Sequence, residues 1–94
     1  MKEPRMSAQT LRVLGVLSRH QELSGAEIGQ AASLPSGTLH PMLARLETSA
    51  WVTSRWEDGD ATALGRPRRR FYEITDEGRR KAKLALLELL AAWP

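Results

Sequence analysis

The sequence has 94 residues, which is the size of one small domain. Its 14 lysines and arginines outnumber its 11 aspartates and glutamates, so the formal net charge is +3 at pH 7. Residues 66–70 alone carry +4, which leaves the rest of the chain at −1. A local basic cluster on a nearly neutral chain predicts a contact with phosphate or acidic groups. The lack of cysteine excludes a disulfide framework and any thiolate metal site, and it fits a reducing cytoplasm.

No targeting or membrane segment is recognisable in the sequence. The opening residues, MKEPRM, are not followed by the apolar run that marks a signal peptide. The longest apolar stretch lies near the C-terminus and has about ten residues, too few to span a bilayer. We therefore expect a cytoplasmic protein that does not use a membrane as a partner, with residues 1–6 as a flexible N-terminus.

Three helices are expected in the first half of the chain. Leucines at helical spacing predict an amphipathic helix over residues 7–19. Ser24 followed by Glu27 has the form of a capping box, so a short second helix should begin there and end near Ala32. A third helix is expected over residues 36–49, because the preceding proline ends the second helix.

The third helix has two different faces. At about 100° per residue, its apolar residues form one buried stripe, which consists of Leu39, Met42, Leu43 and Leu46. The opposite face is small, hydrogen-bonding and not strongly acidic, so it suits insertion into a groove. The residues that we predict to contact DNA from this helix are Ser36, Thr38, His40, Pro41 and Arg45.

A β-hairpin and a last helix follow. Residues alternate between two sides in 51–56 and again in 70–75, which predicts two strands joined by a long loop rich in Gly, Asp and Pro. Thr75 resembles an N-cap, and acidic residues follow it, so a final helix should cover about 76–93. The fold class is therefore mainly α with a small β-hairpin, that is, α+β.

Two segments resemble the PadR-type bacterial transcriptional regulators. LPSGTLHPMLARLETSAWVTSRWE is similar to that family's recognition helix and first wing strand, and GRPRRRFYEITDEGRRK is similar to its wing tip, second strand and last helix. The resemblance implies a winged helix-turn-helix DNA-binding domain over 7–75 and an added C-terminal dimerisation helix over 76–94. The chain differs from the family at His40, where tyrosine is usual, and at Ser33, where glycine is common.

Four arginines stand at the expected hairpin tip, and their guanidinium groups suit contact with phosphates beside the groove that the third helix occupies, or entry into the minor groove. These residues are Arg66, Arg68, Arg69 and Arg70. Alternatively, the loop serves only to keep the protein soluble. Trp51 and Trp56 are interpreted as hairpin packing rather than as stacking platforms for bases.

Nothing in the sequence predicts an enzyme. Ser36 and His40 are four residues apart on one helix, as a nucleophile and its base would be, but no third orienting carboxylate accompanies them. His20 and His40 are the only imidazoles, so neither a metal site nor another cofactor is expected.

The C-terminal stretch LALLELLAAW has a single charge and is apolar around almost its whole circumference. We expect Leu84, Leu87 and Ala91 to pack on the domain, which leaves a second apolar stripe uncovered. That stripe consists of Leu86, Leu89, Leu90 and Trp93. It predicts a homodimer that presents two recognition helices to two half-sites.

The sequence thus predicts a dimeric regulator that binds a specific, two-fold symmetric operator in double-stranded DNA and acts as a repressor. The family resemblance also implies that a flat small molecule could act as an effector near the dimer interface, and no residue identifies it. The alternative is a winged helix that serves as a protein-interaction or assembly module and does not bind DNA specifically.

Overall fold

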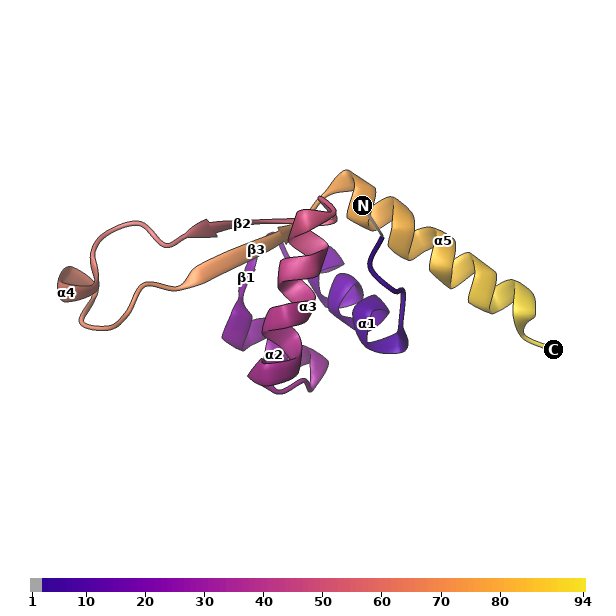
Figure 1. The fold of residues 1–94 in the computed structure, drawn as a ribbon, viewed down its shortest axis with the longest axis horizontal. Helices are drawn as coiled ribbons and strands as arrows, with labels where there is room; N and C mark the ends of the chain where they lie inside the picture. Colours follow the sequence, from indigo (N-terminus) through magenta and orange to yellow (C-terminus); the bar gives the residue numbers. More distant parts are fainter. Residues whose placement is uncertain (1–2) are drawn as a thin grey trace.

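A computed structural model describes residues 3–94 of the chain, so the first two residues of the expected flexible N-terminus lie outside the described part. The elements are α1 (Ala8–Ser18), β1 (Leu23–Ser24), α2 (Gly25–Ala32), α3 (Ser36–Thr48), β2 (Val52–Trp56), α4 (Ala61–Leu64), β3 (Arg70–Ile74) and α5 (Asp76–Ala92) (Figure 1). The predicted order of three helices, a hairpin and a last helix is confirmed. The short elements β1 and α4 were not predicted.

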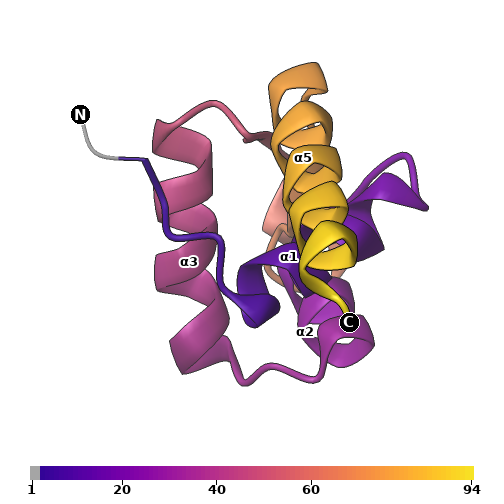
Figure 2. The same ribbon diagram turned by 90° about the vertical axis from the view of Figure 1, so that its right-hand side faces the viewer.

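The core lies where α1, α2 and α3 meet the sheet (Figure 2). Leu14, Leu17 and Ile28 are completely buried in it. The predicted buried stripe of α3 is confirmed, since all four of its apolar residues belong to this core. The three helices therefore hold each other through one apolar cluster, and α3 keeps its opposite face in solvent.

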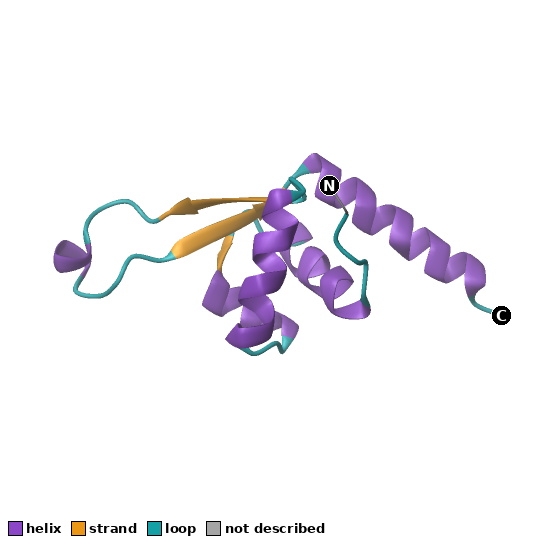
Figure 3. Ribbon diagram, viewed as in Figure 1, coloured by secondary structure: helices purple, strands orange, loops and turns teal. Residues whose placement is uncertain are grey.

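The sheet is antiparallel and has the strand order β1-β3-β2. Val52 pairs with Ile74 and Trp56 with Arg70, while the two residues of β1 pair with Phe71 and Tyr72 on the other edge of β3. The pairing of β2 and β3 carries the hairpin away from the helices as a long wing (Figure 3). Because β1 pins the base of β3, the wing has a fixed direction where it leaves the domain.

Both ends of α2 are defined by local backbone features. Ser24 Oγ accepts from the Glu27 amide at 3.2 Å, and the Glu27 carboxylate accepts from the Ser24 amide at 2.9 Å, so the predicted capping box is present. Ser33 ends α2 in the left-handed region with φ of 56°. That backbone conformation favours glycine, which explains why glycine is common at this position in the resembling family.

α5 begins against the corner between α3 and β2. Thr75 Oγ1 accepts from the Gly78 amide at 2.9 Å and donates to the Ala50 carbonyl at 2.6 Å. A Cβ atom on Gly78 would lie 2.1 Å from the Trp51 carbonyl oxygen, so only glycine allows this approach. The first turn of α5 is therefore fixed to the domain.

Beyond its first turns, α5 leaves the domain and projects into solvent (Figure 1). Leu84 and Leu87 are 44% and 54% exposed, and Ala91 is exposed as well. The prediction that these three residues pack on the domain is wrong, because the face of α5 that turns toward α1 carries Ala82 and Ala85 instead. Within residues 3–94, no helix is long and apolar enough to cross a membrane.

Candidate nucleic-acid interface

The outward face of α3 is open to solvent. All five of its predicted DNA contacts are exposed: Ser36, Thr38, His40, Pro41 and Arg45. Between the polar residues runs a ridge of small side chains that includes Pro41 and Ala44. Pro41 has no amide to donate to the Gly37 carbonyl, so one backbone acceptor of this ridge lacks its helical partner. A slim, exposed helix of this kind matches the major groove of B-DNA, which is about 12 Å wide.

The wing tip is a structured loop. Asp60 caps the single turn α4 by accepting from the Ala63 amide at 2.8 Å, and Gly59 and Gly65 take positive φ angles of 91° and 70° on either side of that turn. These contacts place the four arginines that follow α4 at defined positions.

Arg66 is held inside the wing by a carboxylate. Its two terminal nitrogens donate to the two oxygens of Glu57 at 2.6 and 2.8 Å. Glu57 also accepts from the Arg69 amide at 3.2 Å. The hydrogen bonds from Arg66 lower the pKa of Glu57 to about 2. Arg66 thus closes the wing loop, and its charge is already neutralised.

Arg68 and Arg70 both lie close to the ring of one tryptophan, Trp56. Their guanidinium carbons are 5.8 and 5.1 Å from the ring centre of Trp56, within the range of cation–π contacts. Arg70 also reaches Glu47 of α3 at 3.5 Å. Trp56 is half exposed. On the hairpin it therefore packs against arginines and not against the core.

Arg69 occupies the junction between α3 and the wing. Its guanidinium makes no hydrogen bond with residues 3–94, and it lines a pocket of about 360 Å³ together with His40 and Gly25. A Cβ on Gly25 would lie 3.3 Å from His40 Cε1, so α2, α3 and the wing approach one another closely here. The structure therefore brings Arg69 and His40 together, while it pairs Arg66 and Arg70 with carboxylates.

A family model described as the transcriptional regulator PadR-like family matches residues 13–84. The chain belongs to this family. The match covers the second half of α1, the whole of α2 and α3, the wing and the first half of α5, and it confirms the resemblance seen in the sequence. As a member of this family, the chain has the winged-helix fold of PadR-like transcriptional regulators.

Solved structures share the fold of this PadR-like chain. A PadR family transcription regulator from hypervirulent Clostridium difficile R20291 is 21% identical with a TM-score of 0.73, over 87% of this chain and 86% of that one. PcaV from Streptomyces coelicolor is 18% identical with a TM-score of 0.79, over 93% of this chain and 60% of PcaV. Reduced AbfR bound to DNA is 26% identical with a TM-score of 0.76, over 95% of this chain and 60% of AbfR.

The PadR-like chain therefore spans less than two thirds of the length of PcaV and AbfR. No curated protein sequence matches it.

The residues that were predicted to form the dimer interface of this PadR-like chain are exposed on α5. Leu90 and Trp93 are 71% and 80% exposed, and Leu86 and Leu89 are at least half exposed. Together with Leu84 and Leu87, they make the outer part of α5 apolar around almost its whole circumference, with Glu88 as the single charge. Leu86 and Leu89 line grooves beside α1, yet all six side chains remain between 44% and 80% exposed.

Proposed function

We propose that this protein is a repressor that binds a specific, two-fold symmetric operator in double-stranded DNA as a homodimer. In each subunit, α3 enters the major groove and the wing contacts the neighbouring backbone. The observation that carries the proposal is the slim, exposed face of α3 standing directly beside Arg69 and the wing. A fold with the same arrangement is bound to DNA in AbfR, which is 26% identical to this chain.

The wing arginines differ in what they can give to DNA. Arg69 has an unused guanidinium, and Arg68 makes only one long bond, to the Gly59 carbonyl at 3.4 Å. We assign these two residues to phosphate contacts. Arg66 and Arg70 must exchange a carboxylate for a phosphate, so each contributes less net attraction.

Dimerisation follows from the apolar surface of α5. Six large apolar side chains on one exposed helix are unusual for a monomer, and a second copy of α5 would cover them. Repression then requires only that the dimer occupies a promoter. A flat small molecule near the interface remains the proposed class of effector, and the cytoplasm the proposed compartment.

A gel-shift titration with the DNA upstream of the protein's own coding sequence tests the proposal. We expect a specific complex that a scrambled duplex does not compete away. The alternative, an assembly module without specific DNA binding, requires that both duplexes compete equally. Thr38→Ala and His40→Ala should weaken binding to the cognate duplex by about 1–3 kcal/mol for each lost base contact, and change binding to random DNA little.

A further inference from the structure

The N-terminal segment runs past α3 on the side away from the wing (Figures 1 and 2). Two contacts hold it there. Glu3 forms an ion pair with Lys81 of α5 at 2.6 Å, and Met6 is partly buried against the core. Arg5 lies between these two anchors and is exposed. Its position is therefore set by the residues on either side, although the segment has no regular secondary structure.

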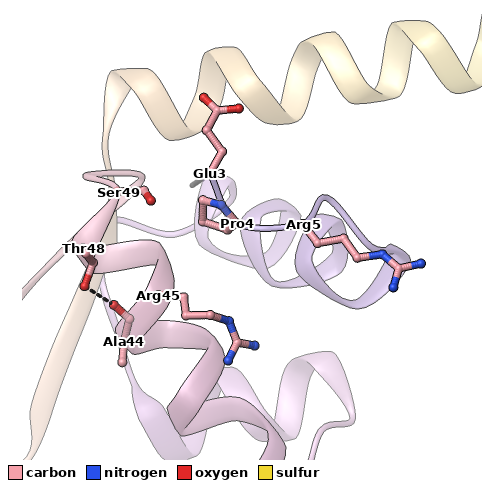
Figure 4. Close-up of a pocket in the computed structure, with 7 residues that line it drawn as sticks. All are labelled: Glu3, Pro4, Arg5, Ala44, Arg45, Thr48 and Ser49. Carbon is pink, nitrogen blue, oxygen red and sulfur yellow. Dashed lines mark hydrogen bonds between the residues drawn. The ribbon is translucent and has the colours of Figure 1, made fainter. Parts of the chain in front are cut away.

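Arg5 shares a groove with Arg45. The groove has a volume of about 540 Å³ and lies between the N-terminal segment and the second half of α3. Pro4 and Ala44 form part of its wall, and the side chains of Arg5 and Arg45 extend toward the same side (Figure 4). Two basic side chains from separate parts of the chain thus meet beside the predicted recognition helix.

Neither of these two guanidinium groups contacts a carboxylate, a backbone carbonyl or an aromatic ring of the described residues. Every other arginine except Arg69 uses its guanidinium on a carboxylate, a backbone carbonyl or an aromatic ring within residues 3–94. Arg5, Arg45 and Arg69 form no such contact with the described residues. All three border α3. Among the described residues, the arginines without such a contact are therefore gathered on or beside this helix.

The three arginines lie on two different flanks of α3. At about 100° per residue, His40 and Arg45 fall on opposite sides of the outward ridge. His40 shares a pocket with Arg69 of the wing, and Arg45 shares the other groove with Arg5. A helix in the major groove has one phosphate backbone on each side. The two basic flanks thus match the two walls of the groove.

We propose that Arg5 and Arg45 together bind a backbone phosphate on the strand opposite the one that the wing contacts. This inference rests on the proposed DNA-binding function and assigns a contact to the N-terminal segment. Two unpaired guanidinium groups on one groove repel each other, and a phosphate between them would relieve that repulsion. Glu3, at the edge of the same groove, does not neutralise them because Lys81 already pairs with it.

Arg5→Ala tests the proposal, with Arg19→Ala as the matched control. Arg19 carries the same charge and is exposed, but it lines the groove between α1 and α5. The affinity of each variant is measured on an operator and a scrambled duplex across several salt concentrations. We expect the slope of log affinity against log salt to become shallower by about two for dimeric Arg5→Ala, at roughly 0.9 per lost phosphate contact. Arg19→Ala should keep the wild-type slope.

Three results would overturn the inference. The first is an equal change of slope for Arg5→Ala and Arg19→Ala, which would mean that only the net charge matters. The second is an unchanged slope for Arg5→Ala. The third is a loss confined to the operator duplex, which would make Arg5 a base-reading residue instead.

A failure of the proposed function gives a different result from a failure of this inference. If the wild type binds neither duplex, the DNA-binding function itself is rejected. If the wild type binds and Arg69→Ala flattens the salt dependence while Arg5→Ala does not, the wing contact stands and only the Arg5 contact is rejected. Thermal melting of the variants confirms that each one is folded.

Discussion

At the scale of single residues, the wing arginines differ in whether a carboxylate already pairs with them, and this decides how strongly each can bind a phosphate. Arg66 donates two hydrogen bonds to Glu57, whereas the Arg69 guanidinium donates none within residues 3–94. A guanidinium that is already paired gains less from a phosphate than one that is free, because it must first give up its carboxylate. The four arginines are therefore not equivalent, although they are close neighbours in the sequence.

Arg69→Ala and Arg66→Ala should consequently differ in their effect on DNA binding. Loss of Arg69 removes one phosphate contact per subunit, so the salt slope of the dimer should become shallower by about two. Loss of Arg66 should change the slope by clearly less, because Glu57 already neutralises Arg66 and the pair brings no net positive charge to a phosphate. Filter-binding titrations across a salt series would measure both slopes. Equal slopes for the two variants would show that Glu57 does not restrain Arg66.

The same ion pair predicts how the wing responds to pH. Arg66 lowers the pKa of Glu57 from 4.5 to about 2. The pair is therefore complete above pH 4.5, and it is lost as the pH falls through about 2. A carboxyl-detected NMR titration should show Glu57 titrating near pH 2 in the wild type and closer to 4.5 in Arg66→Ala. A wild-type value near 4.5 would mean that the wing loop is not closed by this pair in solution.

At the scale of elements, the junction between the wing and α5 sets the shape of the molecule. Gly78 brings the first turn of α5 against the Trp51 carbonyl, and Thr75 bonds the Ala50 carbonyl at 2.6 Å. This corner belongs at once to the end of α3, the start of β2 and the start of α5. The direction in which α5 leaves the domain therefore depends on a few backbone contacts.

Gly78→Ala should destabilise the fold markedly, because the new Cβ would meet backbone and Ile74 as well as the Trp51 oxygen. Overpacking of this kind costs about 1–3 kcal/mol and more where the neighbour is backbone. Gly15→Ala in α1 is the control, since nothing lies within 4 Å of a Cβ there. Alanine should stabilise that helix by about 0.5–1 kcal/mol. Urea denaturation would compare the two, and an unchanged midpoint for Gly78→Ala would contradict the close approach.

The sequence was informative where elements are long and periodic. Hydrophobic spacing located α1 and the buried face of α3, capping signals located the starts of α2 and α5, and alternation located the two wing strands. β1 and α4 have only two and four residues, too few for a period to be visible. The exposure of Leu84 and Leu87 depends on which face of α5 turns toward α1, and a helix that is apolar around almost its whole circumference does not encode that.

The candidate site was predictable in part for the same reason. Periodicity placed the outward residues of α3, and composition located the arginine cluster. The partners of those arginines are tertiary: Glu57 is nine residues from Arg66, and Glu47 is 23 residues from Arg70. The groove between Arg5 and Arg45 likewise has walls that lie far apart in the sequence. No local pattern could have shown it.

At the scale of the whole molecule, the two proposed functional surfaces lie apart. The chain is elongated, with extents of 55 × 26 × 22 Å, and the wing and α5 project to opposite sides of the helical core (Figure 1). A second subunit can therefore cover α5 without blocking α3. This separation is what a dimer needs if it is to present two recognition helices to one duplex.

Dimerisation is tested by charging the apolar surface of α5. Leu86→Glu with Leu90→Glu should give a monomer, because each new carboxylate would be buried without a partner in the interface. Gln30→Glu is the control: it adds a carboxylate on the exposed side of α2 and should sediment with the same mass as the wild type. Sedimentation at tens of micromolar protein would measure all three species. Wild-type protein that sediments as a monomer would remove the proposed interface.

Selection from a pool of random duplexes tests the central claim most directly, because it measures sequence preference and symmetry together. The account predicts that the enriched DNA contains two inverted half-sites whose centres are about one helical turn, 10–10.5 base pairs, or a multiple of it apart. The preference should disappear in His40→Ala with Thr38→Ala, while weak binding to all DNA persists. Enrichment of a single half-site would contradict the dimer. A selected pool no different from the starting pool would contradict specific recognition of DNA by α3.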